Sequence, residues 1–141
     1  MRFLPTAVCL VLLSASIAQA CSCGTAPTTK ESLKHSTAVF SGKVTKIEPF
    51  EKYYFKVTFE IDRTWKGTKG KTETVLTANS GAGCGYTFEK GKSYLLYCDR
   101  PKMDKIKPIP LYTSICSRTK SLKFAAADIK ELGEGKKPKN E

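Results

Sequence analysis

Cysteines constrain this chain more than any other residues, because two of them, one residue apart, stand where we expect the mature chain to begin. A positively charged start, an apolar run and a small-residue sequence ending at Ala20 are typical of a secretory signal peptide. We expect cleavage after Ala20, which removes residues 1–20 with Cys9 and makes Cys21 the N-terminus. The cysteines that remain are Cys21, Cys23, Cys84, Cys98 and Cys116. In an exported chain, five cysteines predict two disulfides and one unpaired thiol.

The leader is also compatible with a lipidated N-terminus. Its apolar run is shorter than the about 20 residues that a spanning helix requires, so we expect a secreted protein, or a periplasmic one in a bacterium. Bacterial lipoproteins likewise begin at a cysteine after small residues, and a lipid on Cys21 is therefore the alternative. Ala18 and Gln19 match the lipoprotein signal poorly, which favours ordinary cleavage.

Length and charge limit the domain count and the partners of the mature chain. The 121 residues that remain of the 141 suit one domain with a modest core, expected over residues 21–133. Loss of Arg2 lowers the formal net charge from +11 to +10. This charge predicts an anionic polysaccharide or a membrane surface as a partner, or serves solubility alone. Residues 134–141 are expected to form a disordered basic tail.

Strict alternation of apolar and polar residues from Tyr53 to Asp62 predicts the clearest β-strand of the sequence. The apolar set expected on one face is Tyr53, Phe55, Val57, Phe59 and Ile61. β-Forming residues separated by glycine and proline turns predict four more strands, near 38–47, 71–78, 93–98 and 112–116. Five strands with regular turns predict a mainly β fold that forms a small closed barrel.

Two short helices are expected to flank the strands. Thr28 and Glu31 stand three residues apart, as in a capping box, and predict a helix that continues to about Ser36. A second helix is expected over residues 125–132, ended by the glycine that follows. Residues 21–27, before the first helix, are expected to form an irregular arm anchored by two cysteines.

Enzymatic chemistry has little support in the sequence. His35 is the only histidine, and its position at the end of a polar helix favours a structural role over a catalytic triad, a dyad or a zinc site. Acidic residues show no paired pattern, and segment 81–83 leads into Cys84 and not into a phosphate-binding helix. We therefore expect a protein that is not an enzyme and has no cofactor of its own.

The sequence Cys21-Ser22-Cys23 carries the most chemical meaning. By itself, Cys-x-Cys is compatible with a redox pair, a soft-metal site or one half of two disulfides. Its place at the expected N-terminus narrows the choice, because a terminal residue fixed by a disulfide presents its α-amine and its carbonyl oxygen as a rigid pair. Such a pair can chelate a metal ion that another protein holds with an open coordination position.

Three motifs, taken in order, resemble those of the tissue inhibitors of metalloproteinases. They are Cys21-Ser22-Cys23, Ala82-Gly83-Cys84-Gly85-Tyr86 and Leu111-Tyr112-Thr113-Ser114-Ile115-Cys116. Segments 40–44 and 57–61 resemble strands of the wider netrin-like module family, whose fold is an OB-type barrel. The similarity extends over nearly the whole mature chain, to about Leu122. It implies a five-stranded OB-type closed barrel with short flanking helices and a disulfide-stapled N-terminal arm.

The resemblance also implies a disulfide pattern and an inhibitory mechanism. Cys21 would pair with Cys84, and Cys23 with Cys116, which makes the arm a rigid wedge across one end of the barrel. In the family, the main-chain nitrogen and oxygen of the residue at the position of Cys21 bind the zinc of the protease. The implied partner is therefore a zinc metallopeptidase, which the protein would inhibit.

Residues near Cys21 are implied as further protease contacts. Ser22 stands at the position that points into the main specificity pocket of the protease, next to Cys23. Gly24, Ala82 and Gly83 would flank the wedge. A wedge held rigid before binding freezes fewer rotamers and loop states on association, which favours affinity from a small contact.

Two other functions stand beside inhibition. A noncatalytic extracellular or envelope binding module, lipidated or not, would use the positive surface and would not require a free amine on Cys21. A barrel that binds single-stranded nucleic acid would use the basic charge and aromatic residues such as Tyr54 and Trp65. Export and disulfides argue against the second function, so we expect no nucleic-acid partner and assign the alternating aromatic residues to the core.

Cys98 is the cysteine left over from the two expected disulfides. It lies within a predicted strand, which favours a buried free thiol over an intermolecular bridge. We therefore expect a monomer.

Overall fold

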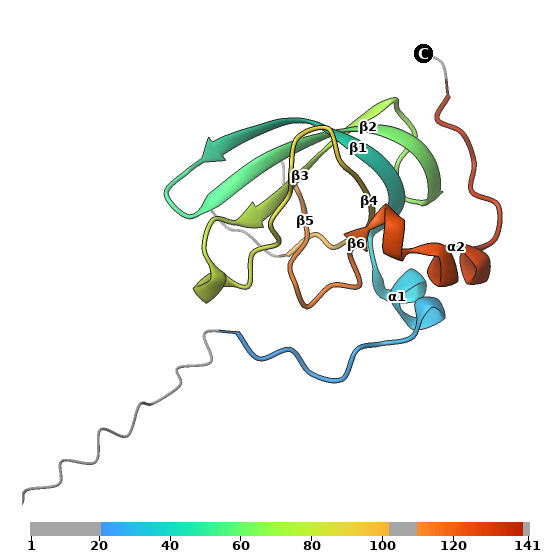
Figure 1. Ribbon diagram of the computed structural model, residues 1–141, viewed down its shortest axis with the longest axis horizontal. Helices are drawn as coiled ribbons and strands as arrows, with labels where there is room; N and C mark the ends of the chain where they lie inside the picture. Colours follow the sequence, from blue (N-terminus) through green and yellow to red (C-terminus); the bar gives the residue numbers. More distant parts are fainter. Residues whose placement is uncertain (1–20, 102–109, 140–141) are drawn as a thin grey trace, which may run out of the picture.

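The computed structural model describes residues 21–101 and 110–139, in which six strands form one mixed sheet flanked by two short helices (Figure 1). The expected signal peptide, residues 1–20, and most of the proline-containing loop after β4 lie outside the described residues. In chain order the strands are β1 (Ala38–Phe50), β2 (Tyr54–Lys66), β3 (Thr72–Ala78), β4 (Ser93–Cys98), β5 (Leu111–Tyr112) and β6 (Lys120–Ser121).

The strands are arranged in the order β5-β3-β2-β1-β4-β6, and neighbours are antiparallel except β3 and β5, which are parallel. This arrangement confirms the predicted mainly β fold. Because β5 and β6 are the edges of the sheet, the predicted closed barrel is not confirmed. Directly after β4, Asp99 exchanges two backbone hydrogen bonds with Tyr112 of β5, with N–O distances of 2.9 and 2.8 Å.

β1 is bent because its pairing with β2 is interrupted by three register shifts. They fall between Val39 and Phe40, between Ser41 and Gly42, and between Val44 and Lys46. Extra residues of this kind bend a strand and increase its twist. Residues 39–43 of β1 pair with β2 on one side and with β4 on the other, so the bent segment joins the two parts of the sheet.

Alternate residues of β1 and β4 belong to two different apolar clusters. The first cluster is formed by residues of the strands and includes Phe40, Phe59, Val75, Leu96 and Leu111. The second cluster contains Val39, Leu95 and Tyr97, packed against residues of the helices such as Leu33 and Ile129. Both faces of β4 and of the first part of β1 are therefore buried, which explains why β4 reads as an apolar run and not as a clean alternation.

Both predicted helices are present. α1 (Thr29–His35) begins with the predicted capping box, in which the Glu31 N–H donates to Thr28 Oγ1 at 3.2 Å and the Thr28 N–H donates to Glu31 Oε2 at 2.8 Å. α2 (Ala126–Leu132) ends at Gly133, and two 3₁₀ turns are η1 (Gly81–Gly83) and η2 (Leu122–Phe124). Within the described ranges, no helix has the length and apolar character that crossing a bilayer requires.

The structure differs from the predicted strands in three respects. Tyr53 and Phe55 continue the predicted alternation but remain 61% and 36% exposed, because the first apolar cluster ends at Val57. The predicted strand 112–116 ends at Tyr112, where the chain turns toward the disulfides, and β6 was not predicted. β6 is only two residues long, too short to leave an alternating pattern in the sequence.

Residues 134–139, which belong to the segment 134–141 predicted to be a disordered tail, lie along the end of β2. Lys136 exchanges two backbone hydrogen bonds with Thr64, both with N–O distances of 2.8 Å. This pairing is possible because β3 pairs with β2 only as far as Glu60, so the backbone of Thr64 on that side has no strand beside it.

Candidate functional site

Two disulfides meet at one point and hold the start of the arm, residues 21–27. Cys21 is joined to Cys84 and Cys23 to Cys116, with Cα–Cα distances of 5.4 and 5.1 Å. The Sγ atoms of Cys21 and Cys116, which belong to different disulfides, lie 3.7 Å apart. Both pairs are those that the family resemblance implies. The arm is thus tied at the same place to two segments that are distant in sequence.

The loop that carries Cys84 has a local reason for its shape. Ser80 Oγ accepts a hydrogen bond from the Gly83 N–H at 3.3 Å and caps η1. Cys84 follows with a φ of 58°, the left-handed conformation that ends the turn. At Gly85 the backbone runs against Ala78, and a Cβ atom there would collide with the Ala78 carbonyl oxygen. Only glycine permits this approach, so Gly85 fixes the direction in which Cys84 leaves the sheet.

The segment that carries Cys116 is bound to the same loop. The Ile115 N–H donates to the carbonyl oxygen of Cys84 at 2.9 Å. Ser114 Oγ accepts from the Cys116 N–H at 3.1 Å, and Thr113 Oγ1, which is buried, donates to the carbonyl oxygen of Tyr97 at 3.1 Å. Hydrogen bonds therefore hold the two disulfide-bearing segments together independently of the disulfides.

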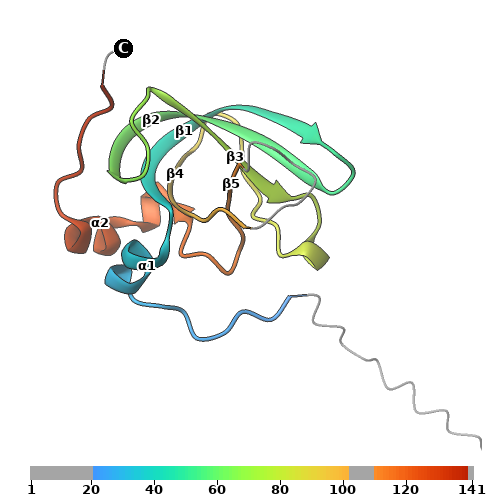
Figure 2. The same cartoon turned by 180° about the vertical axis from the view of Figure 1, so that it is seen from behind.

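The side chains predicted to contact a protease lie at this end of the molecule and are open to solvent. Ser22, Cys23 and Gly24 are exposed, as are Ala82 and Gly83 of η1. Cys21 is half-buried between them. Figures 1 and 2 show the start of the arm beside η1 from both sides. The disulfide from Cys21 to Cys84 thus places the start of the arm next to η1, which ends at Gly83.

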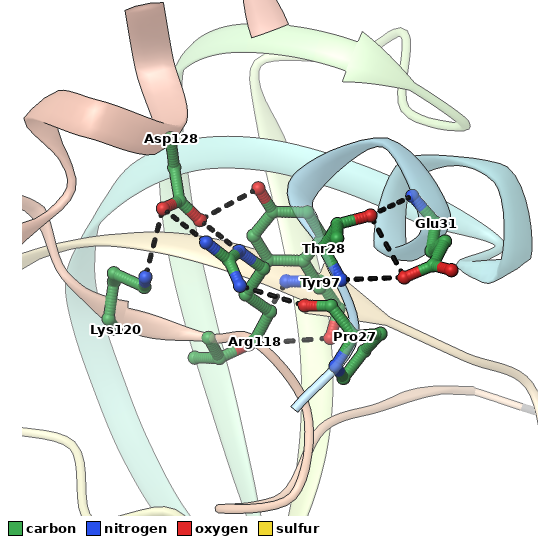
Figure 3. Close-up of polar contacts among 8 residues, drawn as sticks. Pro27, Thr28, Glu31, Tyr97, Arg118, Lys120 and Asp128 are labelled. Atoms are coloured by element: carbon green, nitrogen blue, oxygen red, sulfur yellow. Dashed lines mark hydrogen bonds and ion pairs between the residues drawn. The ribbon is translucent and has the colours of Figure 1, made fainter. Parts of the chain in front are cut away.

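A charged cluster that the sequence analysis did not identify supports the other end of the arm (Figure 3). Asp128 is 2% exposed, and its carboxylate accepts hydrogen bonds from Arg118 Nε and Nη2 at 2.6 and 3.0 Å, Lys120 Nζ at 3.0 Å and the Tyr97 hydroxyl at 3.1 Å. Arg118 Nη1 also donates to the carbonyl oxygen of Pro27 at 2.8 Å. One guanidinium therefore links the arm to α2.

Electrostatics keep this cluster ionised. Burial alone would raise the pKa of Asp128, but hydrogen bonds and charge from Arg118 and Lys120 outweigh it and hold that pKa below its ordinary value. Burial, and then the negative charge of Asp128, raises the pKa of Tyr97, which remains a neutral donor. The sequence shows that Arg118 stands two residues after Cys116. This spacing does not identify Asp128 as the partner of Arg118.

Two other residues considered in the sequence are His35 and Cys98. His35 is the last residue of α1 and its side chain is exposed. Cys98 is a free thiol and is fully buried in β4. Burial, with the nearby charges of Asp99 and Glu73, raises the pKa of Cys98 well above its ordinary value. A buried, protonated thiol is unreactive, as expected for a core cysteine.

The side chains near the disulfides include potential metal ligands. In residues 21–101 and 110–139, the one group of side-chain ligand atoms close enough to hold a metal consists of the sulfur atoms of Cys21, Cys84 and Cys116, within 4.8 Å of one another. These sulfur atoms are engaged in disulfides and are not thiolate ligands. The predicted protease-contacting residues therefore offer main-chain atoms and small exposed side chains.

No protein-family model matches the chain, and no curated protein matches it.

Proposed function

We propose that the mature chain, beginning at Cys21, inhibits zinc metalloendopeptidases. The α-amine and carbonyl oxygen of Cys21 would occupy the open coordination position of the protease zinc and displace its water. Ser22 would enter the specificity pocket next to the zinc. Cys23, Gly24, Ala82 and Gly83 would contact the rims of the cleft. The inhibitor would need no cofactor, because the metal belongs to the protease, and it would carry out no reaction itself.

The observation that carries this proposal is the convergence of both disulfides on the arm. Cys21 and Cys23 are each tied to a separate segment, and the side chain of Ser22 between them is exposed. A main-chain nitrogen and oxygen held in this way lose little conformational entropy when they bind a metal. The distant support from Arg118 to Pro27 limits movement of the arm at its other end.

We also propose that the sheet belongs to an OB-type barrel of the netrin-like kind. Two observations support this closure. β3 and β5 are parallel neighbours, and the backbone pair between Asp99 and Tyr112 connects the end of β4 to β5. With that pair counted, the path β1-β2-β3-β5-β4-β1 returns to its start. The tissue inhibitors of metalloproteinases are the family that this arm and barrel resemble.

Export and a monomeric state are part of the same proposal. The disulfides of the structure are compatible with an oxidising compartment, outside the cell or in a bacterial periplasm. The free thiol of Cys98 is buried and offers no group for a bridge to a second chain.

The test compares the chain that begins at Cys21 with a chain that retains Ala20. An added residue converts the amine into an amide, a very poor zinc ligand, while the barrel is left unchanged. We expect the native form to inhibit at least one member of a panel of zinc endopeptidases. The extended form should be weaker by more than the about 10–100-fold that loss of an outer-shell partner costs a metal site.

Equal unfolding curves of the two forms serve as the control for folding. Equal inhibition by both forms would remove the role of the amine, and no inhibition by either form would remove the proposed function. An intact mass that includes a diacylglycerol group on Cys21 would also contradict it. The lipid would occupy the Cys21 sulfur that otherwise forms the disulfide with Cys84.

The second candidate function is a noncatalytic binding module that uses the basic surface. A specific observation favours it: lysines from two distant parts of the chain line one hollow beside the end of β2. Binding of this kind weakens with salt and does not depend on the amine of Cys21, so the two candidates are separable in the same preparation.

A further inference from the structure

Lysines from two regions of the sequence meet in a hollow of about 360 Å³ next to the end of β2. We call these residues the lysine hollow: Lys66, Lys69, Lys136, Lys137 and Lys139. Glu134 is the only acidic residue in its lining. The other lining residues are uncharged, among them Thr68 and Gly135. The hollow therefore concentrates positive charge in a concave part of the surface.

Backbone pairing, and not chance packing of a loose end, brings the two groups of lysines together. Lys136 pairs with Thr64 through two backbone hydrogen bonds of 2.8 Å, and the Lys139 N–H donates to the carbonyl oxygen of Lys69 at 3.2 Å. These bonds hold residues 136–139 alongside the turn that follows β2. The charged groups are thus placed before any ligand arrives, which lowers the entropy cost of binding.

Contacts on the other side of the segment secure it further. The Trp65 Nε1–H donates to the carbonyl oxygen of Gly133 at 2.9 Å, and Arg63 Nη1 donates to that of Gly135 at 3.2 Å. Gly135 lies so close to the indole that a Cβ atom there would come within 2.8 Å of Trp65 Cε2. Glycine at this position lets the chain pass over the ring and enter the hollow.

No carboxylate of the described residues lies within 4.0 Å of a lysine of the hollow. Among the described residues, carboxylates lie within 4.0 Å of Lys46, Lys56, Arg118 and Lys120 only. Lys66 Nζ donates to the carbonyl oxygens of Leu33 and Lys34 at 2.9 and 2.8 Å, which fixes its position but leaves its charge. Like charges gathered in this way repel one another, and an anion relieves the repulsion.

We infer that the lysine hollow binds an acidic polysaccharide, which names the ligand class for the second candidate function and does not rest on the proposed inhibition. A polysaccharide strand carries anionic groups in a row and fits a concave, lysine-lined surface. A membrane surface fits less well, because it is flat and usually receives apolar side chains as well. The large exposed hydrophobic residues of the described chain are Tyr53, Phe55, Ile115 and Phe124, and none of them lines the hollow.

The test uses the full mature chain and dextran sulfate, with neutral dextran of the same length as the control ligand. The variant Lys137→Glu/Lys139→Glu reverses two charges of the hollow and leaves the backbone pair of Lys136 in place. The matched control is Lys90→Glu/Lys92→Glu, which changes the net charge by the same amount at another exposed turn. We expect roughly tenfold weaker binding or more in the first variant, and a loss below about threefold in the control.

Several outcomes would overturn the inference. Equal losses in the two variants would show that binding follows net charge, and equal binding of neutral dextran would remove the role of the lysines. Binding to vesicles with anionic lipid, without binding to dextran sulfate, would assign the hollow to membranes. Lys69→Glu changes a lysine of the hollow that lies outside the C-terminal segment. It should weaken binding as well, which guards against the case in which Lys137→Glu/Lys139→Glu disturbs the pairing of Lys136 with Thr64. Inhibition measured on the same variants separates this site from the proposed function, because it should not change.

Discussion

Asp128 is a buried carboxylate that depends on hydrogen-bond donors from the surrounding side chains. A carboxylate that is 2% exposed is costly to bury unless donors replace its water, and here four donor atoms from three side chains do so. Arg118 supplies two of the four and uses a third nitrogen to hold Pro27. The arm is therefore supported through a buried ion pair as well as through disulfides.

Replacing Arg118 by methionine should lower the free energy of unfolding by about 3–5 kcal/mol, the cost of removing one partner of a buried ion pair. The change keeps most of the side-chain volume but leaves the buried carboxylate of Asp128 with two donors, and hydrogen bonds to charged groups contribute about 1.5–3 kcal/mol each. Urea unfolding would measure the difference. Arg100→Met, at an exposed arginine, is the matched control and should change stability by less than about 0.5 kcal/mol. Equal effects of the two substitutions would contradict the role of Arg118.

Acid should destabilise the protein partly through Asp128. The pKa of this carboxyl is lowered in the folded chain and is about 3.9 in an unfolded one. Its contribution is therefore complete above the unfolded value and is lost as the pH falls through the folded value. In urea unfolding from pH 6 to pH 2, the Asp128→Asn variant should be less stable at pH 6 and should lose less stability on acidification. A difference between the two proteins that stays constant over this range would show that Asp128 does not contribute.

Secondary-structure elements were predictable where local residue patterns determine them. The capping box at Thr28 predicts the start of α1, and the alternation around Val57 and Phe59 predicts β2, because these signals lie within a few residues of each other. The register shifts that bend β1 have no comparable signal. They depend on which residues of β2 and β4 lie opposite, and those residues are more than ten positions away in the sequence.

Some residues of the candidate site were predicted from the sequence, and others were not. The pairing of Cys21 with Cys84 and of Cys23 with Cys116 was implied by the family resemblance, whereas the cysteine count alone predicts only two disulfides and one thiol. Arg118 and Asp128 could not be paired in this way, because charged residues are common in the sequence and their contact depends on how α2 packs against the sheet. The pairing of Lys136 with Thr64 was missed for the same reason, and a lysine-rich chain end looks identical whether it is paired or free.

The two proposed sites lie at opposite ends of β2. The N–H of Asn79, in the loop that leads to the disulfides, donates to the carbonyl oxygen of Tyr53, the residue just before this strand, at 2.9 Å. Lys66, at the other end, lines the lysine hollow. Thirteen residues of extended chain separate these ends, which at about 3.3 Å per residue is about 40 Å along the curved strand. In Figure 1 the arm lies below the sheet and the C-terminal segment lies at its opposite corner.

This separation predicts that the two sites act independently. A protease bound at the arm and a polysaccharide bound at the lysine hollow would not collide, and screening reduces charge effects beyond a Debye length of about 8 Å at physiological salt. The inhibition constant, measured with an uncharged peptide substrate, should therefore change by less than about twofold when dextran sulfate saturates the hollow. Coupling between sites is reciprocal, so the affinity for dextran sulfate should be equally insensitive to the protease. The Lys137→Glu/Lys139→Glu variant controls for direct effects of dextran sulfate on the enzyme. Relief of inhibition by dextran sulfate in the native protein but not in this variant would show that the hollow and the arm are coupled, and the picture of two separate ends would be wrong.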